Sequence, residues 1–255
     1  MPEMILKPET FLLIVAGWTM LAILVFIWLF FITAPYGRFV RSGWGPMLDG
    51  SLNWLLMELP ALLVFDAIFI WAGQLTTVSW VYFGFWNLHY GYRGLIYPWL
   101  IQRSQRVPLT ITMSGASFNV INAGLQSLWL FVFAPARQVN WLLQPAFIVG
   151  AGLFLVGFLV HVHADHRLRQ LRKELGPGYH IPTGGLFGWI SCPNYFGEFV
   201  EWMGWALLTW SWSGVSFTIW TAANLFPRAI AIHRWYQERI AGYPRKRKAI
   251  LPFLL

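Results

Sequence analysis

Two glutamates and an asparagine lie in an otherwise apolar stretch of the C-terminal third. The segment at residues 179–202, YHIPTGGLFGWISCPNYFGEFVEW, passes from a proline- and glycine-containing loop into an apolar helix that carries Asn194, Glu198 and Glu201. Glu198 and Glu201 are three residues apart and therefore share one helical face. A carboxylate inside a bilayer costs roughly 3 kcal/mol on insertion scales, so this face is predicted to look into a polar cavity. The alternative is that neighbouring helices neutralise both groups as structural hydrogen-bonding partners.

A third carboxylate interrupts the apolar run WLLMELPALLVFD. Glu58 lies one turn from Trp54 and just before Pro60, where a helix can kink and free a backbone carbonyl. The apolar neighbours favour the neutral form of Glu58, which can donate a proton.

The next apolar run, FWNLHYGYRGLIY, carries several polar side chains within three helical turns. Tyr90, Arg93 and Tyr97 are spaced i, i+3 and i+7 and share a face. A lone tyrosine would be read as an interfacial anchor, but a tyrosine near a buried carboxylate suits the reduction of an α,β-unsaturated ketone. Hydride addition to such a ketone pushes negative charge onto the carbonyl oxygen, which then needs hydrogen-bond donors in a dry pocket. We therefore predict that Glu58 and Tyr90 form a catalytic pair.

The composition indicates the elements that must position these groups. Of 255 residues, 57% are hydrophobic and only 11% are charged, which is typical of a polytopic membrane protein. No internal repeat is evident, which argues against an inverted-repeat transporter. We expect an all-α fold and a single membrane-embedded domain, residues 1–255, with seven transmembrane helices. The apolar windows that predict these spans lie near residues 10–34, 51–74, 78–101, 109–134, 140–163, 195–212 and 213–233.

The basic residues predict the orientation of these spans. When successive loops are assigned to alternate sides of the membrane, most Lys and Arg residues fall on one side, and the other side receives only Lys7 and Arg137. By the positive-inside rule, the N-terminus is then outside and the C-terminus is cytoplasmic. The net charge of +8 has two interpretations: the basic residues determine the topology and attract anionic lipid, or some of the arginines bind the phosphates of a cofactor. We do not expect a nucleic acid ligand. The cytoplasmic side receives Arg38, Arg41, Arg103, Arg106, Arg167, Arg169, Arg172, Lys173, Arg234, Arg239, Arg245, Lys246, Arg247 and Lys248.

The sequence has few histidine and cysteine residues that could form a metal site. His161, His163 and His166 resemble part of a histidine box, but membrane di-iron oxidases use several boxes and this chain has six histidines in all. We therefore expect no metal. Cys192 is the single cysteine and excludes an intramolecular disulfide. The Rossmann and Walker A motifs are absent, so a nucleotide would be bound by loops and helix ends.

Several motifs together resemble the steroid 5α-reductase family. The family signature, a Pro-x-Gly-Gly-Leu-Phe turn followed by Asn-x-x-Gly-Glu-x-x-Glu-Trp, is matched between Pro182 and Trp202. Glu58-Leu59-Pro60, Leu88-His89-Tyr90 and the terminal YPRKRKAILPFLL are also similar to family motifs. The resemblance extends with gaps from about residue 36 to the C-terminus.

This resemblance implies an NADPH-dependent reductase of 3-keto-Δ4-steroids. Glu58 and Tyr90 would bind the 3-keto oxygen while hydride adds to C5, and Trp54 and Arg93 would line the substrate site. Met57 stands where the steroid-reducing members have glutamine, so the exact substrate stays open. The implied cofactor-binding residues are Gly37, Arg103, Arg106, Asp165, Arg172, Tyr179, Asn194, Glu198 and Tyr236.

Other functions remain as alternatives. A related membrane reductase would act on a polyprenol, a sterol nucleus or an enoyl thioester. More distant alternatives are an isoprenylcysteine-type methyltransferase and a seven-span receptor or transporter. We expect an apolar enone that arrives from the bilayer, a monomer surrounded by lipid, and a bacterial inner membrane or endoplasmic reticulum location.

Overall fold

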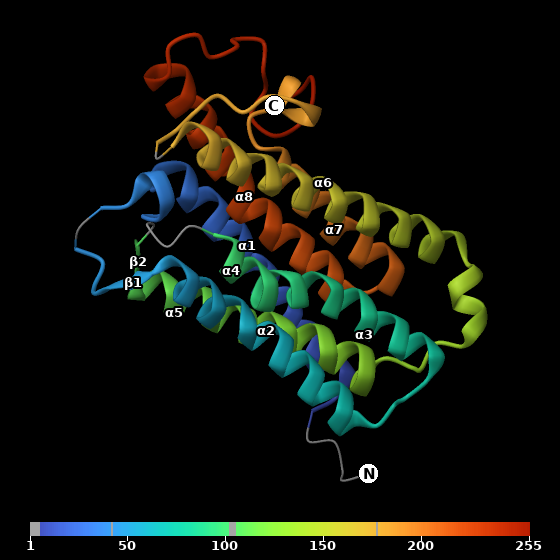
Figure 1. The fold of residues 1–255 in the computed structure, drawn as a ribbon. Helices are drawn as coiled ribbons and strands as arrows, with labels where there is room; N and C mark the ends of the chain where they lie inside the picture. The colour runs from blue at the N-terminus through green and yellow to red at the C-terminus, as the bar shows by residue number, and fades with distance from the viewer. Residues whose placement is uncertain (1–5, 42, 102–105, 177) are drawn as a thin grey trace. The chain divides into compact units, whose positions relative to one another are not determined.

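The structure is a computed structural model that describes residues 6–41, 43–101, 106–176 and 178–255 (Figure 1). The described chain is mainly helical, which agrees with the composition. The α-helices are α1 (Pro8–Phe31), α2 (Gly50–Ala72), α3 (Thr77–Tyr90), α4 (Tyr97–Leu100), α5 (Leu109–Leu128), α6 (Pro145–Leu175), α7 (Pro193–Thr209) and α8 (Trp212–Arg239).

Within the described residues, five helical stretches are long and apolar enough to cross a membrane. They are Pro8–Phe31, Gly50–Ala72, Leu109–Phe133, Pro145–Leu175 and Trp212–Arg239. The other two predicted spans are helical but less regular. Helix α7 has 17 residues, fewer than the ~20 that cross a bilayer core, and α3 passes into the π-helical segment Gly91–Ile96 before α4. Large apolar side chains such as Leu13 and Phe31 are exposed on α1, as lipid-facing side chains would be.

A short β-ribbon departs from the all-α expectation. Strands β1 (Met47–Asp49) and β2 (Arg106–Pro108) pair antiparallel, with Asp49 opposite Arg106. Asp49 ends the ribbon and caps the next helix, because its Oδ1 accepts a hydrogen bond from Ser51 N at 2.9 Å at the start of α2. The ribbon is too short for periodicity to reveal it.

The chain contacts divide into two compact units. The first unit contains the described part of Met1–Ala16 with Ala34–Phe147 and Ser211–Ser213, and the second contains Gly17–Thr33, Ile148–Trp210 and Gly214–Leu255. In the first unit, α2 packs along α5 (Figure 1). Aromatic rings fill its core: Phe65 stacks on Trp86 at 4.5 Å between ring centroids and meets Phe131 edge-on at 5.3 Å.

Glycines let α6 and α7 pack backbone to backbone in the second unit. Gly157 on α6 lies against Gly197 and Glu201 of α7, and Gly204 on α7 lies against Gly150 and Phe154 of α6. A Cβ atom at Gly157, Gly197 or Gly204 would overlap the main chain of the facing helix. As the chain advances along α6 from Gly150 to Gly157, the facing residues of α7 go back from Gly204 to Gly197. The two helices therefore run antiparallel, as Figure 1 also shows. Small residues at such contacts are the usual way that membrane helices approach closely.

The C-terminal segment folds back onto the loop that precedes α7. Ile190 and Lys248 form a parallel bridge, Ser191 N donates to Lys248 O at 2.8 Å, and Cys192 N donates to Ala249 O at 3.1 Å. The start of α7 is therefore held by main-chain hydrogen bonds from residues more than fifty positions later.

Candidate active site

The structure brings Glu58 and Tyr90 into one buried cluster of the first unit. Glu58, on α2, is 6% exposed, and Tyr90, the last residue of α3, is 2% exposed. Asn119 of α5 lies between them: its Nδ2 is 3.3 Å from Glu58 Oε2, and its Oδ1 is 3.5 Å from the Tyr90 hydroxyl. The proposed pair is thus joined through one amide.

Arg93 and Trp54 belong to the same cluster. Arg93 Nη2 lies 3.4 Å from Glu58 Oε1, and its guanidinium carbon lies 4.2 Å from the centre of the Trp54 ring. A guanidinium over an indole face is a favourable cation–π contact. Arg93 is on the π-helical segment Gly91–Ile96, whose widened turns are frequent at functional sites. Gly94, which has no side chain, faces the main chain of Glu58 and Leu59, and this lets α2 and the π-helical segment pack closely.

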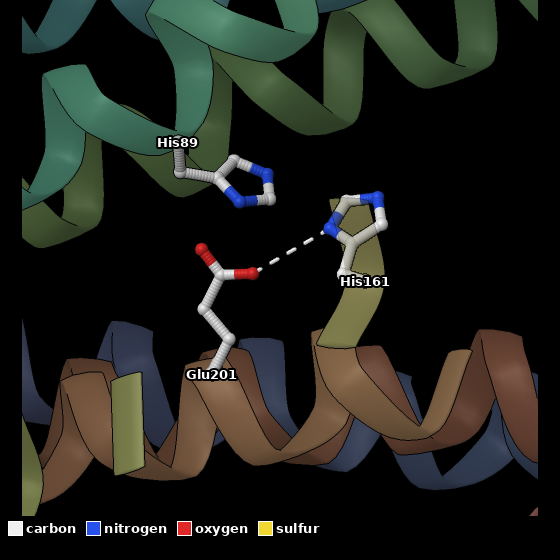
Figure 2. A group of neighbouring side chains, drawn as sticks. All are labelled: His89, His161 and Glu201. Atoms are coloured by element: carbon white, nitrogen blue, oxygen red, sulfur yellow. Dashed lines mark ion pairs between the residues drawn. The ribbon is translucent and has the colours of Figure 1, made fainter. Parts of the chain in front are cut away.

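A second polar network lies in the second unit, where α6 meets α7. Asn194 Nδ2 donates to Asp165 Oδ1 at 3.0 Å, and Asp165 Oδ2 is 3.4 Å from His161 Nε2. On its other side, His161 Nδ1 is 3.6 Å from Glu201 Oε2, the ion pair that is dashed in Figure 2. Glu201 is fully buried, whereas Glu198, three residues earlier, is half-buried. Of the two glutamates on α7, Glu201 is therefore the structural partner of α6.

The remaining cofactor candidates have varied positions. Arg172, Tyr179 and Glu198 are half-buried and Tyr236 is buried, all in the second unit. Tyr179 and Tyr236 are linked through the Trp235 ring, which lies 4.8 Å from Tyr179 and 5.6 Å from Tyr236. Gly37 and Arg106 belong to the first unit; Gly37 has a φ of 58°, which favours glycine, and Arg106 is exposed on β2. Arg103 lies outside the described residues.

A compact hydrogen-bonded cluster anchors the C-terminal segment. Ser191 Oγ is 2.6 Å from His233 Nδ1 and 2.6 Å from the Tyr243 hydroxyl. Tyr236 stacks on Tyr243 at 4.9 Å between ring centroids. Burial raises the pKa of Tyr243, although its hydrogen bond with Ser191 opposes the shift. This cluster holds in place the loop from which α7 and Asn194 begin.

Asn119 and the Ser191 cluster were missed by the sequence reasoning. Asn119, Asn122 and Gln126 are polar residues within the apolar window 109–134, and all three are buried. A polar side chain within a membrane-spanning segment costs free energy, so the three amides in this window were the signal that could have pointed to Asn119. Ser191, His233 and Tyr243 come from three separate segments, and no spacing in the sequence relates them.

Comparison with known proteins gives consistent matches. A family model described as 3-oxo-5-alpha-steroid 4-dehydrogenase matches residues 105–255. The chain is 39% identical to steroid 5-alpha-reductase DET2 of Arabidopsis thaliana over 233 residues, which cover 88% of each chain. It is 38% identical to 3-oxo-5-alpha-steroid 4-dehydrogenase 1 of Bos taurus over 242 residues, 92% of this chain and 93% of the bovine protein. The human protein of the same name is 36% identical over 86% of this chain and 85% of its own length.

Proposed function

Because this chain belongs to the 3-oxo-5-alpha-steroid 4-dehydrogenase family, we propose that it is an NADPH-dependent oxidoreductase that reduces the Δ4 double bond of 3-keto-Δ4-steroids to 5α-dihydrosteroids. The observation that carries this proposal within the molecule is the buried cluster of Glu58, Asn119 and Tyr90. Hydrogen-bond donors in a water-excluded site are what a developing enolate requires.

In the proposed reaction, Glu58 and Tyr90 bind the 3-keto oxygen. NADPH, when bound, would supply the hydride for C5, and negative charge would then develop on the C3 oxygen that Glu58 and Tyr90 hold. The Tyr90 hydroxyl and protonated Glu58 would each donate a hydrogen bond to that oxygen without giving up the proton. A proton that comes from water is then added at C4, and the electron pair on the C3 oxygen returns to form the C=O bond, which restores the ketone.

The distances within the cluster suit this role. The contacts of Asn119 with Glu58 and Tyr90, and of Arg93 with Glu58, are 3.3–3.5 Å long. Strong hydrogen bonds are nearer 2.7–3.0 Å, so these donors exchange partners at small cost. Catalytic hydrogen bonds are often long without substrate and shorten in the reacting complex.

The chemistry of the second unit fits a dinucleotide. Arg172 provides a half-buried guanidinium for a phosphate, and Asn194, oriented by Asp165, keeps an amide oxygen available as an acceptor. Glu198 is a half-buried carboxylate that suits ribose hydroxyls, and the rings linked to Tyr179 offer aromatic faces. The family resemblance alone assigns Gly37, Arg106 and Tyr236 to the cofactor, and Arg103 lies outside the described residues.

We place the enzyme in a membrane as a seven-span protein with a cytoplasmic C-terminus. The five long apolar helices of the described chain and the asymmetry of basic residues support this arrangement. An apolar steroid then arrives laterally from the bilayer, while the cofactor arrives from the cytoplasm. A monomer in a bacterial inner membrane or the endoplasmic reticulum completes the proposal.

The test is reduction by the purified protein with isotopic labels. Incubation with NADPH deuterated in the transferred position and a Δ4-3-ketosteroid should give a saturated ketone that carries deuterium at C5. The same reaction in D2O with unlabelled NADPH should place deuterium at C4. Reduction of a polyprenol, sterol or enoyl thioester in place of the steroid would favour a related reductase, and methyl transfer from S-adenosylmethionine would favour the methyltransferase.

A further inference from the structure

We propose that Asn119 is a positioning residue of this reaction, whose amide determines how hydrogen bonds run between Glu58 and Tyr90. The proposal rests on the proposed function, in which these two side chains bind the carbonyl oxygen. Asn119 is 6% exposed and comes from α5, whereas Glu58 comes from α2 and Tyr90 from α3. One side chain thus joins the two catalytic groups, which lie on different helices.

A backbone contact determines the orientation of the amide. Asn119 Nδ2 lies 2.6 Å from the carbonyl oxygen of Met57. Because a carbonyl only accepts hydrogen bonds, the side of Asn119 that faces Met57 must be the NH2 group. The opposite orientation would bring two oxygen acceptors into contact. The second hydrogen of the same NH2 group is directed to Glu58 Oε2, and the amide oxygen faces Tyr90.

The direction of each hydrogen bond follows from this orientation. The amide oxygen only accepts, so Tyr90 donates its hydroxyl hydrogen to Asn119. Glu58 Oε2 accepts from this NH2 group, while Glu58 Oε1 accepts from Arg93 Nη2 at 3.4 Å. Asn119 therefore holds the carboxyl group of Glu58 by its Oε2 atom. It also holds the Tyr90 hydrogen in a weak 3.5 Å contact from which a ketone oxygen can take it.

A matched control residue lies one turn further along α5. Asn122 is also buried, and its hydrogen-bond partner among the described residues is Gln126, four positions along the same helix. An asparagine-to-leucine change at either position removes a buried amide of the same size. Only the change at Asn119 is expected to alter the behaviour of Glu58 and Tyr90.

The kinetic test is a double-mutant cycle. We expect Asn119→Leu to lower kcat by ~10- to 100-fold, with the Kd for NADPH changed less than about 2-fold. In a Glu58→Gln, Tyr90→Phe background, the same change should lower kcat by less than about 3-fold, because the groups through which it acts are already altered. Asn122→Leu should show equal effects in both backgrounds. Equal effects of Asn119→Leu in both backgrounds would overturn the proposal.

A spectroscopic measurement separates positioning from a general loss of structure. A conjugated enone absorbs at longer wavelength when its carbonyl oxygen accepts hydrogen bonds. The Δ4-3-ketosteroid bound with NADP+ should show this red shift in the wild type and in Asn122→Leu, and a smaller shift in Asn119→Leu. An unchanged red shift in Asn119→Leu would contradict the positioning role.

Failure of the proposed function would be recognised separately. If the wild type neither bound nor reduced the steroid, the assigned reaction would be wrong. Thermal unfolding of the Asn119→Leu, Glu58→Gln and combined variants needs no substrate and still measures the link between the two residues. Non-additive shifts in unfolding temperature would support the link, and additive shifts would refute it.

Discussion

A single methyl group added at Gly197 should separate α6 from α7. A Cβ atom there would lie 2.5 Å from His161 N and 2.7 Å from Gly157 O. Ordinary contacts of carbon with nitrogen or oxygen need a separation near 3.4 Å, so Gly197→Ala requires the helices to move apart by ~1 Å. Overpacking of this kind costs about 1–3 kcal/mol of unfolding free energy.

The same displacement should weaken cofactor binding. The Asn194–Asp165 hydrogen bond is 3.0 Å long and crosses from α7 to α6, so a shift of ~1 Å takes it beyond hydrogen-bonding range. Loss of an oriented amide of this kind should raise the Kd for NADPH by about 10-fold, which corresponds to the ~1–1.5 kcal/mol of one hydrogen bond. The assays are thermal unfolding and NADPH titration of the purified protein.

Gly152→Ala is the matched control. Gly152 is also on α6, but a Cβ atom there meets nothing within 4 Å. An alanine in an open helical position is expected to stabilise the protein by about 0.5–1 kcal/mol and to leave NADPH affinity unchanged. If Gly197→Ala unfolded at the same temperature as Gly152→Ala, the close packing of these helices would not exist in solution.

Three further predictions concern the proposed catalytic pair, the proposed cofactor residues and the C-terminal anchor. Glu58→Gln and Tyr90→Phe should each lower steroid turnover by at least ~10²-fold, the scale of one lost oxyanion donor, while NADPH titration shows unchanged affinity; near-normal turnover in both would exclude the pair. Arg172→Ala and Asn194→Ala should weaken NADPH binding, measured by equilibrium titration, but leave steroid binding intact because phosphate and ribose contacts lie away from the reacting carbon; unchanged affinity in both would refute the assignment. Because burial raises the pKa of Tyr243 above 10.0, its stabilisation of the fold is complete below that pH and declines as the pH rises past it. Unfolding temperatures between about pH 8 and pH 11 should fall more steeply for the wild type than for Tyr243→Phe, and parallel curves would rule out this contribution.

Local patterns in the sequence predicted the helices and the family, because both depend on residues that are close in the chain. The apolar windows correspond to helices, and the family resemblance is confirmed by the comparisons. The Glu58 and Tyr90 motifs were recognisable because each is local, and the structure then places both side chains in one cluster.

Relations between distant segments could not be predicted in the same way. Asn119 contacts Glu58 from a position 61 residues away, and which face of α5 turns to α2 depends on tertiary packing. The i, i+3 pattern also treated Glu198 and Glu201 alike, whereas the packing of α7 on α6 buries Glu201 completely and leaves Glu198 half-buried. The β1–β2 pairing likewise joins segments that no local pattern connects.

The π-helical segment Gly91–Ile96 amounts to a change of register within one helix. A π-turn accommodates one more residue than an α-turn, so every side chain after it is rotated by about 100° from the position that a continuous α-helix would give. Tyr90 precedes the segment and Arg93 lies within it, and both belong to the cluster around Glu58. Tyr97 follows the segment, so the position of its ring, 5.2 Å from the Trp54 ring between centroids, depends on this one extra residue. The side chains that follow the segment can therefore change direction with one residue of chain length, while the proposed catalytic residues Glu58 and Tyr90, which do not follow it, keep theirs.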